Sequence, residues 1–131
     1  MIKEAFPDAK IVFIHRNPLN VAVSLRKGKV MPSMSLTAAA NYWNDSFIIM
    51  KNFKKFYAES VIDVPYLSLT TKPHETFKEL LLDINEDPDL LTIPDSYVYE
   101  ERNPYLTELH PAEQNYIREF CSEGMLELGY D

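Results

Sequence analysis

KIVFIHRNPLNVAVSLRKG, residues 10–28, carries the strongest structural signal in the chain. Residues 10–15 form a nearly continuous apolar run rich in β-branched side chains, which predicts a strand buried on both faces of a parallel sheet. Asn17 is suited to cap a helix whose first residue is Pro18, and Gly28 is suited to end it. The stretch therefore predicts a strand, a tight turn and a helix.

The longest helical pattern begins at about Ser35. Apolar side chains recur there at spacings of three and four, which predicts one wide buried face. The members of this face are Leu36, Ala39, Ala40, Trp43, Phe47, Met50, Phe53 and Tyr57. Because Trp43 lies on this face, we expect it to be a core residue.

Residues 61–69, VIDVPYLSL, return to strand character. We place the core of this second strand from Pro65 to Leu69, and a helical connection between two strands favours a right-handed parallel crossover. A short amphipathic helix is expected from Pro73. A single final helix is expected from about Pro111 to the glycine at position 129.

These elements predict an α/β fold with a partial parallel sheet flanked by helices, in one domain over residues 1–131. Two parallel strands do not make a stable sheet alone. Either further strands lie in residues 88–105, or the chain is the second part of a larger α/β domain, and we favour the second alternative.

The formal net charge of −7 argues against a general nucleic-acid binder, which would need a basic face. Basic residues are nevertheless crowded into positions 10–29, so any bound anion must be held locally. One cysteine excludes an intrachain disulfide and disfavours a cysteine-based metal site. The chain has no apolar signal core or membrane span, and we expect a soluble, cytoplasmic protein.

Arg16 is expected at the carboxyl end of the first strand, where α/β sheets bind ligands. A guanidinium can bind phosphate through two hydrogen bonds, and free N–H groups at the start of the following helix would point to the same place. Asn17, Asn20, Ser24 and Lys27 share one face of that helix. This pattern predicts an anion site. The alternative is that Arg16 pairs with an acidic neighbour and the polar face lies in solvent.

FPDAKIVFIHRNPLNVAVSL, residues 6–25, resembles the 3′-phosphate-binding segment of sulfotransferases that use 3′-phosphoadenosine 5′-phosphosulfate (PAPS). Residues 41–53 resemble the tryptophan-bearing helix of that family. Residues 64–84 resemble its tyrosine-bearing strand with the helix that follows, and residues 112–130 resemble its closing helix. The resemblance therefore covers nearly the whole chain and implies a P-loop-NTPase-like sulfotransferase fold.

The resemblance also implies which residues bind the donor nucleotide. Arg16 and Ser24 match the family's two 3′-phosphate positions, Tyr66 matches a tyrosine near the adenine, and Arg102 lies where many members place a basic residue. The acidic residue usual after that tyrosine is Leu67 here. The implied reaction transfers a sulfuryl group from PAPS to a hydroxyl or amine acceptor and requires no metal.

Family members also carry a Gly-, Ser- and Thr-rich loop for the 5′-phosphosulfate and a general base, both upstream of the segment resembled by residues 6–25. None of the three glycines lies in such a loop. We therefore expect a truncated sulfotransferase domain that is weakly active or inactive alone and that self-associates through exposed sheet edges. The alternative function is a non-catalytic nucleotide-binding or protein-interaction module. A nucleotide kinase is disfavoured because its phosphate loop and magnesium ligand are not visible.

Overall fold

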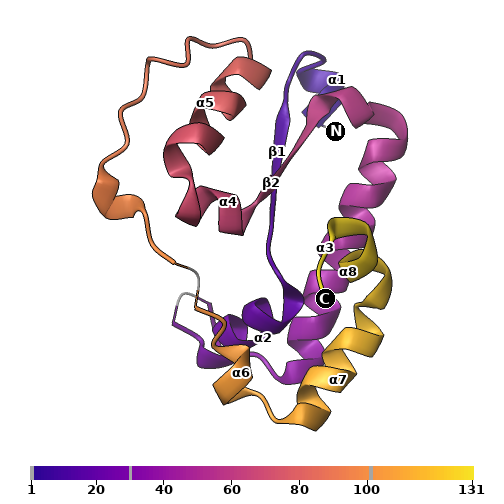
Figure 1. Cartoon of the computed structure of the whole chain (residues 1–131). Helices are drawn as coiled ribbons and strands as arrows, with labels where there is room; N and C mark the ends of the chain where they lie inside the picture. The colour runs from indigo at the N-terminus through magenta and orange to yellow at the C-terminus, as the bar shows by residue number, and fades with distance from the viewer. Residues whose placement is uncertain (1, 30, 101) are drawn as a thin grey trace. The chain divides into compact units, whose positions relative to one another are not determined.

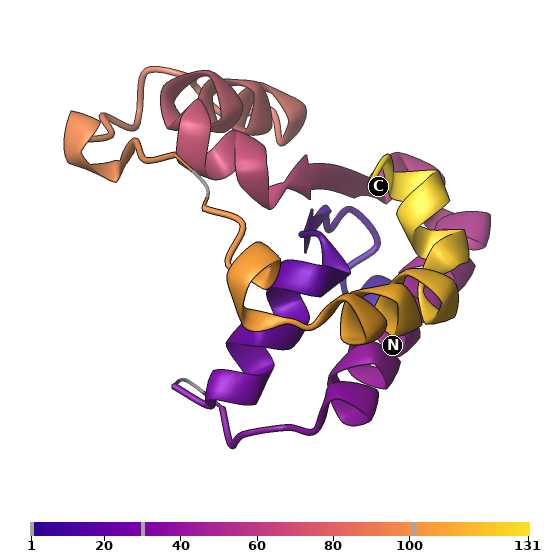
Figure 2. The ribbon, with the colours of Figure 1, turned by 60° about the horizontal axis from the view of Figure 1, so that its bottom comes forward.

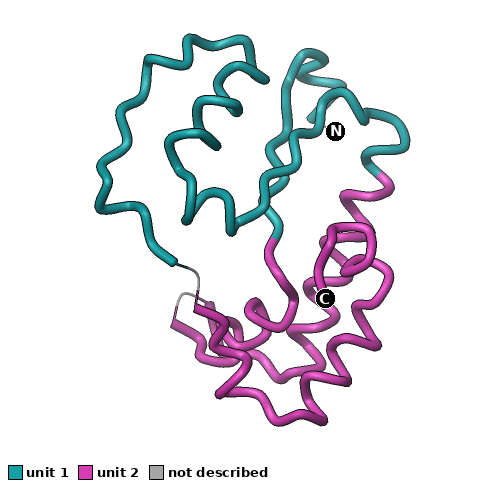
Figure 3. Tube along the Cα trace, in the orientation of Figure 1, with its two compact units in different colours: residues 1–15, 53–101 teal, residues 16–52, 102–131 magenta. Residues whose placement is uncertain are grey.

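The computed structural model describes residues 2–29, 31–100 and 102–131. The chain forms two compact units, each built from segments that are distant in sequence (Figure 3). Unit 1 contains residues 1–15 and 53–101, and unit 2 contains residues 16–52 and 102–131. None of the helices formed by the described residues is long and apolar enough to cross a bilayer.

Unit 1 contains the sheet. Its strands β1 (Ile11–His15) and β2 (Val61–Pro65) pair in parallel, from Ile11 opposite Val61 to His15 opposite Pro65 (Figure 1). Short helical turns, α1 (Ile2–Ala5) and η1 (Ala58–Ser60), precede the two strands. The prediction of an α/β chain with a partial parallel sheet flanked by helices is confirmed.

The second strand lies earlier in the sequence than predicted. It ends at Pro65, and the expected strand core from Pro65 to Leu69 is wrong, because helix α4 (Tyr66–Thr71) begins directly after the proline. Proline has no N–H to donate to a ladder, so it suits the end of this strand. The β-branched residues of the segment precede it, whereas Tyr66–Leu69 has none.

The sheet is less covered than the sequence predicts. The side chains of Val12 and Ile14 in β1 are 38% and 54% exposed, so the expected burial on both faces is not found. On the opposite face, the Lys54 ammonium lies 5.6 Å from the centre of the Phe13 ring and bonds both carboxylate oxygens of Asp63. The described part of residues 88–105 forms no strand, so the alternative of further strands in that segment is wrong.

The rest of unit 1 is helical or irregular. Helix α5 (Pro73–Asp83) begins at Pro73 as predicted, since proline at the first helical position loses no hydrogen bond. It packs near α4 and β2 (Figure 1). A 3₁₀ turn, η2 (Asp95–Tyr97), interrupts the long loop that follows.

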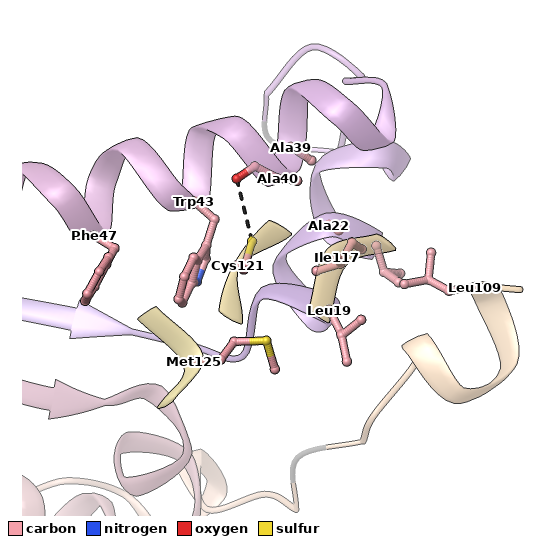
Figure 4. Packing of buried hydrophobic residues seen from close by; sticks show 11 residues of the cluster. Leu19, Ala22, Ala39, Ala40, Trp43, Phe47, Leu109, Ile117, Cys121 and Met125 are labelled. Atoms are coloured by element: carbon pink, nitrogen blue, oxygen red, sulfur yellow. Dashed lines mark hydrogen bonds between the residues drawn. The ribbon is translucent and has the colours of Figure 1, made fainter. Parts of the chain in front are cut away.

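Unit 2 holds the hydrophobic core. Helices α6 (Tyr105–Glu108) and α7 (Pro111–Phe120) both lie against α2 (Pro18–Lys27) (Figure 2). The unit is completed by α8 (Ser122–Leu128) and by the part of α3 (Leu36–Tyr57) before residue 53. The buried cluster consists of Leu19, Ala22, Val23, Ala39, Ala40, Trp43, Phe47, Leu109, Ile117, Cys121 and Met125 (Figure 4). The predicted core role of Trp43 is confirmed.

The predicted single final helix is wrong, because α7 and α8 are separated at Cys121. The cause is tertiary. Gly124 in α8 lies so close to α3 that a Cβ there would stand 2.6 Å from Trp43 Cζ3 and 3.0 Å from Phe47 Cγ. The break lets α8 approach α3 at that glycine. The predicted stop is confirmed, since Gly129 ends α8 in the left-handed conformation.

The Cys121 thiol is fully buried at this break, 3.8 Å from the Ala40 carbonyl oxygen (Figure 4). Burial raises its pKa to about 11, so little of the reactive thiolate exists near neutral pH. We expect Ellman's reagent to modify the native chain at pH 8 roughly a hundredfold more slowly than the urea-unfolded chain. Equal rates in both states would show that the thiol is accessible.

Candidate anion site

The turn between β1 and α2 places Arg16 directly after the strand and Asn17 at the helix N-cap. Arg16 is half-buried. The Asn17 side-chain oxygen accepts a hydrogen bond from the Leu19 N–H at 2.9 Å, and its carbonyl oxygen accepts from the Asn20 and Val21 N–H groups, each at 3.1 Å. Gly28 closes the helix with φ +61°. The predicted roles of Asn17, Pro18 and Gly28 at the ends of this helix are confirmed.

The same geometry corrects one expectation about the site. Pro18 has no N–H, and the next three N–H groups of α2 all bond to Asn17. The first turn therefore offers an anion the positive end of the helix dipole but none of the free backbone donors expected from the sequence. Side chains must supply the hydrogen bonds.

The polar face of α2 is covered at two points by the segment that leads into and forms α6. Asn20 is only 1% exposed, and its side-chain N–H donates to the Asn103 side-chain oxygen at 3.0 Å. The Lys27 ammonium lies 2.6 Å from a Glu108 carboxylate oxygen. The alternative of a polar face that merely lies in solvent is therefore wrong for Asn20, whereas Lys27 is an exposed residue with a surface ion pair.

Ser24 and Arg102 remain exposed beside this contact. The Ser24 hydroxyl forms no hydrogen bond with the described residues, although Asn20 and Lys27 on the same face are both bonded. Arg102 directly precedes Asn103, so the Asn20–Asn103 hydrogen bond holds its segment against α2. Arg16, Ser24 and Arg102 thus belong to one unit, with Arg16 in the turn before α2 and Ser24 on α2 itself.

Other basic residues of positions 10–29 also bond to protein groups. The Arg26 guanidinium binds both carboxylate oxygens of Glu113 at 3.0 and 3.3 Å and lowers the pKa of that carboxyl. The Lys10 ammonium donates to the Glu59 carbonyl oxygen at 2.8 Å. Burial lowers the pKa of His15, which favours the neutral imidazole. The candidate anion ligand at the turn is Arg16, because it directly follows β1 and precedes the N-cap of α2.

A groove in unit 1 offers a contrasting environment. It encloses about 270 Å³ between β2 and α5 and is lined by Asp63, Glu75, Glu79 and Asp83, with Lys72 as its only basic residue among those described. Carboxylates in this number repel a phosphate, so the groove is not a second candidate for an anion. Among the described residues, no three or more His, Cys, Asp or Glu side chains lie close enough together to hold a metal ion, and this includes the carboxylates of the groove.

Comparison with known proteins identifies the family. The sulfotransferase family matches residues 1–86, which is more than half of the chain. The chain belongs to the sulfotransferase family. An uncharacterized protein of Aquifex aeolicus (strain VF5) is 31% identical over 83 residues, which are 58% of this sulfotransferase chain and 11% of that protein. The chain therefore spans about a tenth of the length of this curated relative.

Two solved structures show the same fold. The mouse sulfotransferase SULT7A1, complexed with PAP, matches with a TM-score of 0.63 and 16% identity over 95% of this chain and 60% of that one. The sulfotransferase domain from the curacin biosynthetic pathway matches with a TM-score of 0.62 and 17% identity over 98% of this chain and 56% of that one. This sulfotransferase chain thus spans a little over half the length of each.

Tyr66 lies in unit 1 of this sulfotransferase, as the first residue of α4 and not within a strand. It is half-buried, and its hydroxyl shares a hydrogen bond with the Tyr99 hydroxyl. The Tyr99 backbone N–H donates to the Thr70 carbonyl oxygen at 2.9 Å, which ties the long loop to α4. The sequence predicted a site role for Tyr66 but gave no sign of its bond to Tyr99, because no local pattern indicates a partner 33 residues away.

Proposed function

We propose that this sulfotransferase chain binds the 3′-phosphate of PAPS through the side chains of Arg16, Ser24 and Arg102. The main support for the proposal is that the turn after β1, the polar face of α2 and the segment beginning at Arg102 all belong to unit 2. The Asn20–Asn103 hydrogen bond joins α2 to that segment. Arg16 and Ser24 are also the two positions that match the family's 3′-phosphate ligands.

The chemistry of these groups suits a phosphate monoester. A guanidinium offers paired N–H donors in a plane, which match two phosphate oxygens, and Ser24 adds a hydroxyl donor. The positive end of α2 favours a dianion placed at its first turn. The chain carries a formal net charge of −7, so a bound anion must be held locally by cationic side chains such as Arg16 and Arg102.

The proposed role of this chain is to position the donor. The reaction would transfer the sulfuryl group of PAPS to a hydroxyl or amine acceptor, and holding the 3′-phosphate fixes the donor for an in-line transfer. From the resemblance, Tyr66 would contact the adenine. We assign the general base to no residue of this chain. The single free cysteine suits the reducing cytoplasm, where we propose that the protein acts.

Calorimetric titration of the chain with adenosine 3′,5′-bisphosphate tests this function. We expect it to bind at least about tenfold more tightly than adenosine 5′-monophosphate, because charge-assisted hydrogen bonds to the 3′-phosphate are made only by the bisphosphate. Adenosine 2′,5′-bisphosphate is the charge-matched control and should bind weakly.

Equal affinities for the three nucleotides would contradict a 3′-phosphate site. So would the absence of any heat of binding from a sample whose circular dichroism and cooperative unfolding show that it is folded.

A further inference from the structure

The indole N–H of Trp43 donates a hydrogen bond to the backbone carbonyl oxygen of Arg16 at 2.9 Å. The two residues are 27 positions apart, and both belong to unit 2. Trp43 is 7% exposed, so this bond is largely shielded from water. A core tryptophan therefore contacts the main chain of the residue that we propose to hold the phosphate.

The carbonyl of Arg16 lies at the point where the backbone changes from strand to helix. The register of the sheet ends one residue earlier, at His15, and α2 begins two residues later, at Pro18. The peptide plane between Arg16 and Asn17 therefore lies between the paired part of the sheet and the first residue of α2. The Trp43 hydrogen bond holds this plane at its carbonyl oxygen, and this plane and the one before Arg16 together determine the direction in which the Arg16 side chain leaves the main chain.

Trp43 itself is held firmly by its neighbours. Its ring stacks on Phe47, with ring centres 6.0 Å apart and planes inclined by 12°. A methyl group at Gly124 would overlap the six-membered ring of Trp43. The next residue, Met125, belongs to the same buried cluster as Trp43 (Figure 4). The indole cannot turn without displacing α8, so the position of its N–H is fixed by the packing around the ring.

We propose that Trp43 is a positioning residue of the anion site, which fixes the peptide plane after Arg16 and so pre-orients its guanidinium. Pre-orientation lowers the conformational entropy lost when a ligand binds. The ligand named here rests on the proposed function, whereas the hydrogen bond and its effect on the main chain exist in the free protein. Trp43 does not touch the nucleotide in this role.

The sharpest test removes the N–H and keeps the ring. Replacing Trp43 with β-(3-benzothienyl)alanine substitutes sulfur for the N–H at nearly the same size, and Trp43→Phe is the conventional variant. Phe47→Leu is the matched control, because it alters the core beside Trp43 but keeps the indole N–H and the close packing of Gly124 against the indole. Two quantities are measured for each: affinity for adenosine 3′,5′-bisphosphate, and the chemical shift and exchange rate of the Asn17 amide, which shares its peptide plane with the Arg16 carbonyl.

We expect both Trp43 variants to bind the bisphosphate about five- to tenfold more weakly and to shift the Asn17 amide in the free chain, with less than about twofold loss of affinity in Phe47→Leu. An unchanged Asn17 amide in the benzothienyl variant would overturn the inference. An equal loss of affinity in Phe47→Leu would also overturn it, since core packing alone would then explain the effect.

The free-chain measurement separates this inference from the proposed function. If the wild-type chain binds no bisphosphate, the proposed ligand is wrong, but the Asn17 amide still decides whether Trp43 orients the Arg16 peptide plane.

Discussion

Arg16→Ala is expected to weaken binding of adenosine 3′,5′-bisphosphate about thirty- to hundredfold, the largest effect on binding of any single change in the chain. A hydrogen bond to a charged group contributes about 1.5–3 kcal/mol, and an arginine that binds phosphate through two N–H groups lies at the upper end of that range. No backbone donor of the first turn of α2 can replace the lost contacts, because those N–H groups bond to Asn17. Affinity for adenosine 5′-monophosphate should change little.

The matched control is Arg26→Ala, which removes the same charge from the last turn of α2. Its guanidinium is bound to Glu113, so we expect less than about threefold loss of affinity. Arg102→Ala should fall between the two, because Arg102 is exposed and its contacts with phosphate are screened by water. Similar losses in the Arg16 and Arg26 variants would mean that only net charge matters and that no phosphate site exists at the turn.

Gly124→Val is expected to lower the free energy of unfolding by about 2–3 kcal/mol, the largest effect on stability that we predict. Its Cβ would overlap the rings of Trp43 and Phe47, so α8 must move away from α3 and open the core. Urea denaturation followed by circular dichroism measures the change. Ala112→Val, at an exposed position of α7, is the control and should lower it by less than about 1 kcal/mol.

The same variant should also weaken nucleotide binding, because Trp43 cannot keep its place beside Arg16 when α8 is displaced. A Gly124→Val chain as stable as the wild type would show that α8 is free to shift, and the account given above for the break at Cys121 would then be wrong.

Local signals explain why much of the fold was predictable. The unit from β1 to α2 depends on neighbours in sequence: a β-branched run, an Asn N-cap, a proline in the first turn and a left-handed glycine at the end. Where the outcome depended on tertiary contacts, prediction failed. Nothing near Cys121 in the sequence indicates that α8 must turn towards α3, and Pro65 is compatible with either end of a strand.

The candidate site was likewise predictable where neighbours in sequence determine it, and not where distant residues do. Arg16 and Ser24 stand out because a strand end, a helix start and a family resemblance coincide within nine residues. The contacts that organise them join residues far apart: Asn20 with Asn103 across 83 positions, and Trp43 with Arg16 across 27. The supply of backbone donors was misjudged because the sequence does not reveal that Asn17 would accept hydrogen bonds from all three N–H groups that follow Pro18.

The sequence contains one tryptophan, and that tryptophan is bonded to the main chain of Arg16. Indole emission responds to the polarity and hydrogen bonding around the ring, and no second fluorophore of this type masks the signal. The chain therefore carries its own optical reporter beside the proposed anion site. We expect binding of a nucleotide, sulfate or inhibitor to Arg16 to change the Trp43 emission. Binding could then be measured by intrinsic fluorescence in the unlabelled, unmodified protein.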